Sequence, residues 1–172
     1  MSEQSNDCID AVLIECARDV VETLRDRGLT VITAESCTAG LISAALSLAD
    51  GASDVLHGGF VTYTKANKTM ALGVDAEILA REGSVNARVV QSLCEGALAR
   101  SPADLALAIS GVLGPSPDED GNPVGLIYFC CLQRGGEPSH RRKDYGAQPH
   151  NVLRRTAVLD AFDMILACAR ER

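Results

Sequence analysis

The sequence predicts an α/β fold, a three-layer α/β/α sandwich built by a single domain over residues 1–172. Helix-like and strand-like segments alternate along the chain, as in proteins whose helices pack on both faces of a sheet. Residues 105–109 and 124–132 are apolar at almost every position, the pattern of strands buried on both faces. No repeat, low-complexity tract or linker divides the chain, so we expect one body.

The helices are predicted from apolar residues at helical spacing and from boundary signals. Asp7 is the expected cap of the first helix and Gly28 its stop. Asp50-Gly51 breaks the second, and Asn86 caps the fourth. A further short helical piece is expected between the third and the fourth. The five helices are expected over residues 8–24, 38–49, 64–73, 86–100 and 150–168.

Five strands are expected between these helices. The last of them is polar, which indicates an edge position. The strands are expected over residues 29–34, 59–63, 105–109, 124–132 and 141–145.

The composition is that of an acidic chain with an aliphatic core. Apolar residues make up 47% of the sequence but aromatic residues only 3%, so the core must be built mainly from Ala, Val, Leu and Ile. The net charge of -7 argues against nucleic acid as the main partner, because binding to phosphate requires a basic surface. It leaves room for an anionic substrate in a local positive pocket.

The cysteines and the N-terminus indicate a cytoplasmic protein. Seven cysteines, an odd number, are scattered through apolar patterns without a Cys-x-x-Cys pair, so they predict neither a zinc site nor a disulfide framework. The polar, acidic N-terminus does not resemble a secretory signal, and no apolar stretch is long enough to span a membrane. The cysteines are at positions 8, 16, 37, 94, 130, 131 and 168.

Three loops follow predicted strands on the side where open α/β sheets place their sites. They comprise residues 35–40, 63–68 and 110–125. The third is rich in glycine and proline, and a loop of that length in a compact domain is usually functional or mobile.

The first loop carries Ser36 and Cys37, at the end of a strand and beside the expected helix N-terminus. Such a corner can hold a nucleophile and stabilise an oxyanion with backbone N–H groups. The ordinary role of a serine here is to cap the helix, and Thr38 is an alternative cap that would leave Ser36 free. Cys37 is the alternative nucleophile, because a helix N-terminus would lower the pKa of its thiol.

A serine nucleophile needs a base, and the sequence offers lysines rather than a histidine. No Gly-x-Ser-x-Gly motif is present, and no spacing links a histidine to the first loop. A lysine kept neutral by burial can take this role. Lys65 and Lys68 share a helix face just past the second strand, although both could be solvated surface residues. Tyr63 could reach the same cleft.

Several motifs occur in one order along nearly the whole chain. They are Thr-Ala-Glu-Ser-Cys-Thr-Ala-Gly (33–40), Gly-Gly-Phe-Val-Thr-Tyr (58–63) with Lys68 and Leu-Gly-Val (72–74), and Ile-Ser-Gly-Val-Leu-Gly-Pro (109–115) with Pro-Val-Gly (123–125). Together they resemble the C-terminal domain of the competence/damage-inducible protein A (CinA) family. Stand-alone members of that family hydrolyse nicotinamide mononucleotide (NMN) to nicotinate mononucleotide and ammonia.

The resemblance implies a three-layer α/β domain and a site without cofactor or metal. It places the catalytic nucleophile at Ser36, the lysine base at Lys68 and a pocket tyrosine at Tyr63. We expect a pyridine nucleotide as the small-molecule substrate, no nucleic-acid or membrane partner, and a homo-oligomer. The residues expected to bind substrate are Glu35, Cys37, Thr38, Ala39, Gly40, Ser110, Gly111, Gly114 and Arg154.

The chain departs from the family pattern in three places. Residues 116–121 are acidic where the family has a second glycine-rich run, and Asn122 replaces a lysine. Residues 146–148 read Gly-Ala-Gln where the family commonly has Gly-Asp-Arg, and the segment after them is about two residues longer. Two alternatives therefore stay open: a hydrolase of another small amide, and a non-catalytic nucleotide-binding or regulatory relative.

Overall fold

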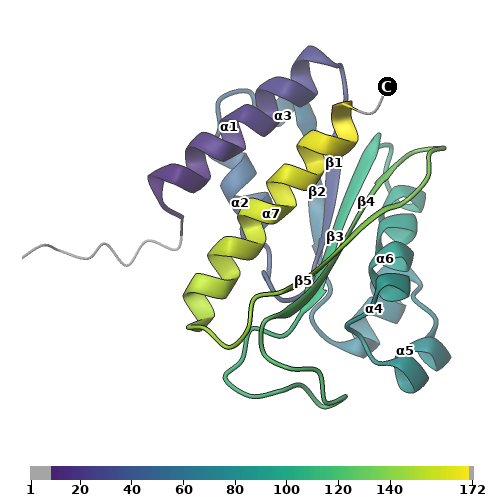
Figure 1. Ribbon diagram of the computed structural model, residues 1–172. Helices are drawn as coiled ribbons and strands as arrows, with labels where there is room; N and C mark the ends of the chain where they lie inside the picture. Colours follow the sequence, from purple (N-terminus) through teal and green to yellow (C-terminus); the bar gives the residue numbers. More distant parts are fainter. Residues whose placement is uncertain (1–8, 171–172) are drawn as a thin grey trace, which may run out of the picture.

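The computed structural model describes residues 9–170 and contains a mixed five-stranded sheet between two layers of helices (Figure 1). The strand order is β2-β1-β3-β4-β5, with β1 parallel to β2 and to β3, whereas β4 and β5 are antiparallel to their neighbours. The predicted three-layer α/β/α sandwich is confirmed. The strands are β1 (Val31–Glu35), β2 (Leu56–Val61), β3 (Leu105–Gly111), β4 (Leu126–Gln133) and β5 (Ser139–Asp144).

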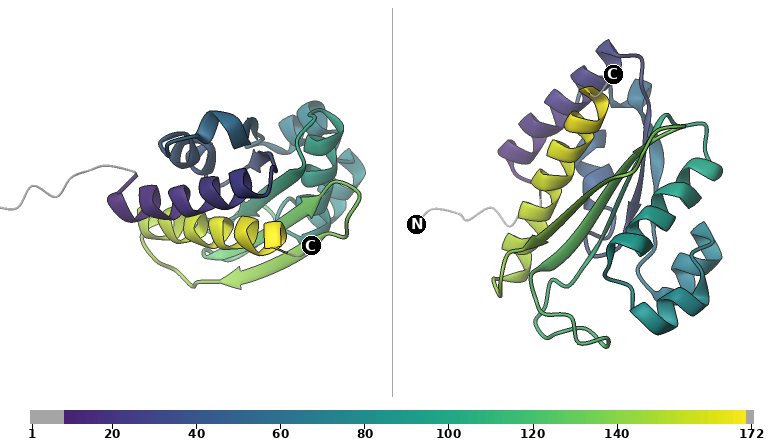
Figure 2. Two further views of the ribbon diagram at one scale, coloured as in Figure 1. Left: turned by 90° about the horizontal axis from the view of Figure 1, so that it is seen from above. Right: turned by 45° about the vertical axis from the view of Figure 1, so that its right-hand side comes forward.

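Helices cover both faces of the sheet (Figure 2). Helices α1, α2, α3 and α7 pack on one face, with α1 and α7 side by side, and α4, α5 and α6 pack on the other. They are α1 (Ala11–Asp26), α2 (Leu41–Ser47), α3 (Ala52–Val55), α4 (Lys65–Leu72), α5 (Ala76–Glu82), α6 (Ala87–Ala99) and α7 (His150–Arg170).

The strand patterns follow from this layering. All five residues of β1 are buried, and successive side chains enter opposite layers: Val31 packs with α1 and α7, whereas Ile32 packs with α6. The predicted burial of β3 on both faces is confirmed. The polar strand β5 lies at the edge, as expected, with alternating half-buried and exposed residues. The core is aliphatic apart from a few rings such as Phe129 and Phe162.

Several helix boundaries differ from the prediction. Helix α1 begins at Ala11, because the Asp10 carboxylate accepts a hydrogen bond from the Leu13 N–H at 3.0 Å and caps it there. The expected cap, Asp7, lies outside the described residues, as does Cys8. The short helix α3 was not predicted. As expected, helix α4 stops at its C-cap Gly73, and helix α6 begins directly after its N-cap Asn86.

Two observations concern the cysteines and the apolar length of the helices. None of the six cysteines within the described residues forms a disulfide. None of the helices described in residues 9–170 is long and apolar enough to cross a membrane.

The carboxyl ends of β2, β1 and β3 meet at one edge of the sheet. The ladder continues past them, because the Ser36 N–H donates to the Ile109 carbonyl at 3.1 Å and the Thr62 N–H to the Glu35 carbonyl at 2.8 Å. The residues that follow these three strands are therefore held next to one another, and they form the candidate functional site.

Candidate active site

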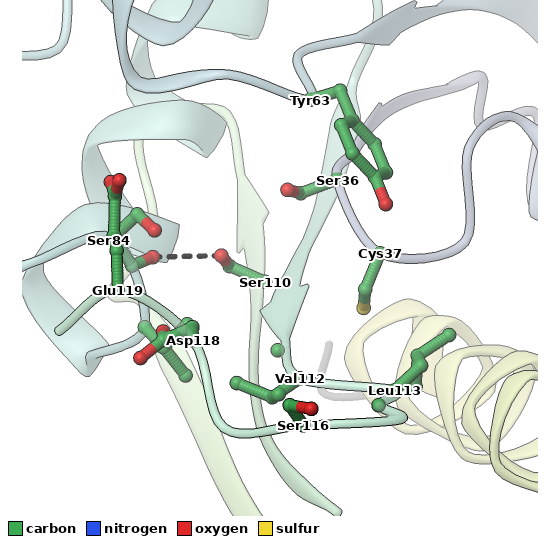
Figure 3. Close-up of a pocket in the computed structure, with 13 residues that line it drawn as sticks. Ser36, Cys37, Tyr63, Ser84, Ser110, Val112, Leu113, Ser116, Asp118 and Glu119 are labelled. Carbon is green, nitrogen blue, oxygen red and sulfur yellow. Dashed lines mark hydrogen bonds between the residues drawn. The ribbon is translucent and has the colours of Figure 1, made fainter. Parts of the chain in front are cut away.

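A cavity of about 340 Å³ opens at this edge of the sheet. The turn after β1 and Tyr63 lie on one side of it, and the loop between β3 and β4 lies on the other (Figure 3). Within the described residues, no group of three or more His, Cys, Asp or Glu side chains is arranged to hold a metal ion. The cavity is lined by Ser36, Cys37, Tyr63, Ser84, Val85, Ser110, Gly111, Val112, Leu113, Gly114, Ser116, Asp118 and Glu119.

Ser36, which lines the cavity, is in contact with Lys68, which is buried and does not line it. The Lys68 Nζ lies 2.9 Å from the Ser36 Oγ and also donates to the Thr62 carbonyl at 2.7 Å. Thr64 caps helix α4 through the Asn67 N–H, and Lys68 follows one turn into the helix. Only 1% of the Lys68 side-chain surface is exposed, an unusual degree of burial for a lysine.

Burial changes the chemistry of this lysine. It lowers the pKa of Lys68 from 10.5 to about 8, because desolvation disfavours the charged ammonium. A substantial fraction of the amine is therefore neutral near pH 8. In that form the nitrogen can accept the proton of the Ser36 hydroxyl across their hydrogen bond.

The turn before helix α2 leaves Ser36 free of a capping role. Ala39 has a φ of 53° and Gly40 a φ of 92°, so the chain reverses and the helix begins only at Leu41. The predicted start near Thr38 is therefore wrong. Gly40 occupies the cap position, where the left-handed backbone favours glycine, and no side chain at that position caps the helix.

The side chain of Glu35 caps the N-terminus of helix α2. Its buried carboxylate accepts hydrogen bonds from the Ile42 and Ser43 N–H groups at 3.0 and 2.9 Å. It also accepts from the hydroxyls of Thr33, Thr38 and Ser43 at 3.1, 2.8 and 2.8 Å. Glu35 was expected to bind substrate, but its carboxylate lies behind the turn and does not line the cavity. The side chain is committed to fixing the turn that carries Ser36.

Cys37 lines the cavity but does not have the predicted low pKa. Burial of the side chain raises the pKa of the thiol to about 12. Because Glu35 binds the Ile42 and Ser43 N–H groups, the start of helix α2 is not available to stabilise a thiolate. Cys37 is therefore an un-ionised thiol at neutral pH.

The wall formed by β3 carries three of the expected substrate-binding residues. Ser110, Gly111 and Gly114 all line the cavity, and the Ser110 Oγ donates to the Ser84 carbonyl at 2.7 Å. A Cβ atom at Gly111 would lie 2.8 Å from the Leu126 carbonyl oxygen, so this close approach requires glycine. Tyr63 lines the opposite wall and is 65% exposed.

Arg154 lies elsewhere. It lines a separate small cavity at the start of α7, together with His150 and Arg155, and does not border the cavity that contains Ser36. His57 and His140 do not border that cavity either, as the sequence indicated. The structure therefore brings Ser36, Cys37, Tyr63 and the predicted residues in and after β3 to one cavity. Of the other residues expected to bind substrate, Thr38, Ala39, Gly40 and Arg154 do not line it.

Several lining residues were not identified from the sequence. Ser84 and Val85 come from the short segment between α5 and α6, whose composition carries no motif. Asp118 and Glu119 come from the acidic loop, and only their departure from the family pattern drew attention to them. Thr62 is fully buried beside Lys68, and its hydroxyl has no hydrogen-bond partner.

Comparison with known proteins assigns the family. Residues 14–169 match the family described as the CinA C-terminal domain. The chain belongs to this family. The predicted resemblance is thereby confirmed over most of the sequence.

Relatives of the CinA C-terminal domain include proteins of known name and structure. The chain is 35% identical over 156 residues to the Escherichia coli K12 nicotinamide-nucleotide amidohydrolase PncC, with 91% of this chain and 94% of the relative covered. It is 45% identical over 118 residues to a CinA-like protein of Akkermansia muciniphila, which covers 69% of this chain but only 28% of that longer protein. The crystal structure of competence/damage inducible protein CihA from Agrobacterium tumefaciens is 37% identical and superimposes with a TM-score of 0.88, covering 92% of this chain and 96% of CihA.

Proposed function

We propose that this protein is an amidohydrolase that converts NMN to nicotinate mononucleotide and ammonia, with Ser36 as nucleophile and Lys68 as base. One observation carries the mechanism: the Nζ of a buried lysine with a pKa of about 8 lies 2.9 Å from a serine hydroxyl in a cavity. The name of the E. coli relative, which is similar over 91% of the chain, supports the choice of a nicotinamide nucleotide. No metal ion is required for this chemistry.

The reaction runs through a covalent acyl-enzyme. In this proposal neutral Lys68 accepts the Ser36 proton as the Oγ attacks the carboxamide carbon, and backbone N–H groups of the turn, residues 37–40, are the candidates for holding the oxyanion. Protonated Lys68 gives its proton to the departing ammonia. Water, activated by the neutral amine, then attacks the ester and releases the carboxylic acid. The pyridinium charge makes the carbonyl electrophilic from the start.

The remaining residues of the site have supporting parts in the proposal. Ala39 and Gly40 shape the turn, and Ser110, Gly111 and Gly114 allow substrate to approach the backbone of β3 closely. Tyr63 offers an aromatic face and a hydroxyl at the cavity mouth. We further propose that the protein is a cytoplasmic homo-oligomer. Light scattering on the purified protein tests its oligomeric state.

The test is ammonia release from NMN by the purified protein near pH 8.5. We expect Ser36→Ala and Lys68→Ala each to lower the rate at least about a hundredfold, because the proton transfer and the acylation both depend on this pair. Ser47→Ala and Lys143→Ala are matched controls, since both side chains lie outside the cavity, and they should retain the wild-type rate. Ammonia release that is unchanged in Ser36→Ala contradicts the proposal.

A further inference from the structure

We propose that the acidic mouth of this cavity selects a cationic pyridinium carboxamide without a phosphate, so that the nucleoside nicotinamide riboside is a better substrate than NMN. The proposal rests on the amidohydrolase function proposed above. It concerns the part of the substrate that lies beyond the reacting carboxamide. The observations that carry it are the charges on the loop opposite Ser36.

Within residues 9–170, the cavity lining holds two carboxylates and no arginine or lysine. Asp118 and Glu119 are the charged side chains among these lining residues, whereas Lys68 is buried beside Ser36 and does not line the cavity. Figure 3 places Ser36 on one side of the cavity and Ser116 and Asp118 on the other. A ligand that presents its carboxamide to Ser36 therefore extends its ribose end toward the carboxylates.

Asp118 holds a fixed negative charge at this wall. Its Oδ1 accepts hydrogen bonds from the Asp120 and Asn122 N–H groups at 3.0 and 2.8 Å, and its Oδ2 accepts one from the Asn122 side-chain amide at 2.9 Å. These donors are neutral, so they fix the position of the carboxylate without cancelling its charge. Asn122 is uncharged, so it adds no cation to this turn.

The cation that contacts the loop, Lys65 at the start of α4, is already neutralised. The Lys65 Nζ lies 2.9 Å from the Glu119 Oε1 and 2.7 Å from the Asp120 Oδ1. The ammonium of Lys65 thus balances one of the three carboxylates of Asp118, Glu119 and Asp120, which leaves a net negative charge at the mouth. Arg154, the arginine expected to bind substrate, lines a different cavity.

The net negative charge at the mouth acts in opposite ways on the two ends of NMN. The pyridinium cation is attracted by the carboxylates and can stack on the exposed ring of Tyr63. The phosphate dianion is repelled by the same carboxylates, and among the described residues that line the cavity there is no cation to compensate for the repulsion. Nicotinamide riboside, which lacks the phosphate, is still attracted through its pyridinium cation but is no longer repelled.

The experiment compares kcat/KM for nicotinamide riboside and for NMN, both measured by ammonia release at pH 8.5. At low ionic strength we expect the nucleoside to be favoured by at least about tenfold, and the preference should fall as salt is raised because salt screens charges at an open mouth. Glu119→Gln removes one carboxylate from the cavity lining and leaves Lys65 paired with Asp120 alone, and should shift the ratio toward NMN by at least about threefold. Glu137→Gln, in the exposed β4–β5 turn, makes the same change in net charge and should leave the ratio unaltered.

The outcomes separate this proposal from the one it rests on. If neither compound releases ammonia, the amidohydrolase function itself is wrong. If NMN is hydrolysed as well as or better than the nucleoside, only the charge selection is overturned. A preference for the nucleoside that ignores both salt and Glu119→Gln also overturns it, because the carboxylates would then not be the cause. The double variant Asp118→Asn/Glu119→Gln, checked for an unchanged Tm, should shift the ratio further toward NMN than the single variant.

Discussion

The turn after β1 and the loop after β3 border the same cavity from opposite sides. In the turn, the polar side chains of Glu35, Ser36 and Thr38 are buried, and each has a hydrogen-bond partner inside the protein. In the loop, Asp118 is half-buried and Glu119 exposed, and their partners come from the loop itself or from Lys65 at the rim.

This difference separates two tasks. A nucleophile and its base must be held within a few tenths of an ångström, which burial and hydrogen bonding of the turn achieve. The loop has only to present charge and shape to the remote part of the substrate. Changes to the turn should therefore act on kcat, and changes to the loop on KM and on substrate choice.

Lys68→Met should produce the largest effect on the turn side. We expect ammonia release to fall at least about a hundredfold, because methionine cannot accept a proton. The free energy of unfolding at pH 7 should stay the same or rise, because the shift in the pKa of Lys68 from 10.5 to about 8 corresponds to about 3 kcal/mol against the charged form. Ammonia assays and thermal unfolding measure the two effects.

The pH dependence of the free energy of unfolding gives a second test of Lys68→Met. The unfolded chain binds the Lys68 proton more tightly than the folded one, so wild-type stability should rise between about pH 8 and pH 10.5. Lys68→Met should lack that rise. Loss of stability together with activity in the variant would show a purely structural lysine.

Glu35→Gln should produce the next largest effect. Glutamine offers one acceptor oxygen to donors that now bind two, so the turn should loosen and kcat should fall about ten- to a hundredfold with a smaller change in KM. Stability should fall by about 1–3 kcal/mol. Asp104→Asn is the matched control, because the Asp104 carboxylate binds the Thr30 N–H and hydroxyl at the opposite end of β1. It should lose stability without a comparable loss of kcat.

Lys65→Met should have the smallest effect. Its ion pairs with Glu119 and Asp120 are partly exposed, and such pairs contribute about 1 kcal/mol or less. We expect kcat to change by less than about threefold and KM for NMN to rise modestly, because the loop gains uncompensated negative charge. A fall in kcat as large as that of Lys68→Met would contradict the assignment of kcat to the turn and of KM to the loop.

Much of the fold followed from local patterns. The continuous apolar runs at β3 and β4, the glycine at 73 and the cap at Asn86 predicted elements that the structure contains. The start of α2 was mispredicted because its cap is the carboxylate of Glu35, which reaches forward from the strand, and no local pattern of serine or threonine reveals that. The short helix α3 carries too few residues for a periodic signal.

The candidate site was predictable where chemistry and motif coincide. Ser36, Lys68 and Tyr63 follow neighbouring strands, so topology alone brings them to one edge. The roles of Glu35 and Cys37 depend on burial and on hydrogen-bond partners, and those exist only once the chain has folded. The same is true of Ser84, which reaches the cavity from a segment without any motif.

The proposed reaction requires the neutral amine of Lys68 to activate Ser36. Its most direct test is kcat/KM for NMN between pH 7 and pH 9.5, where the phosphate remains a dianion and the thiol of Cys37, with a pKa of about 12, does not titrate. We expect a rise of about tenfold per pH unit that levels off near pH 8, because the reactive form of Lys68 is the deprotonated one. A profile that is flat or falls across this range would contradict it.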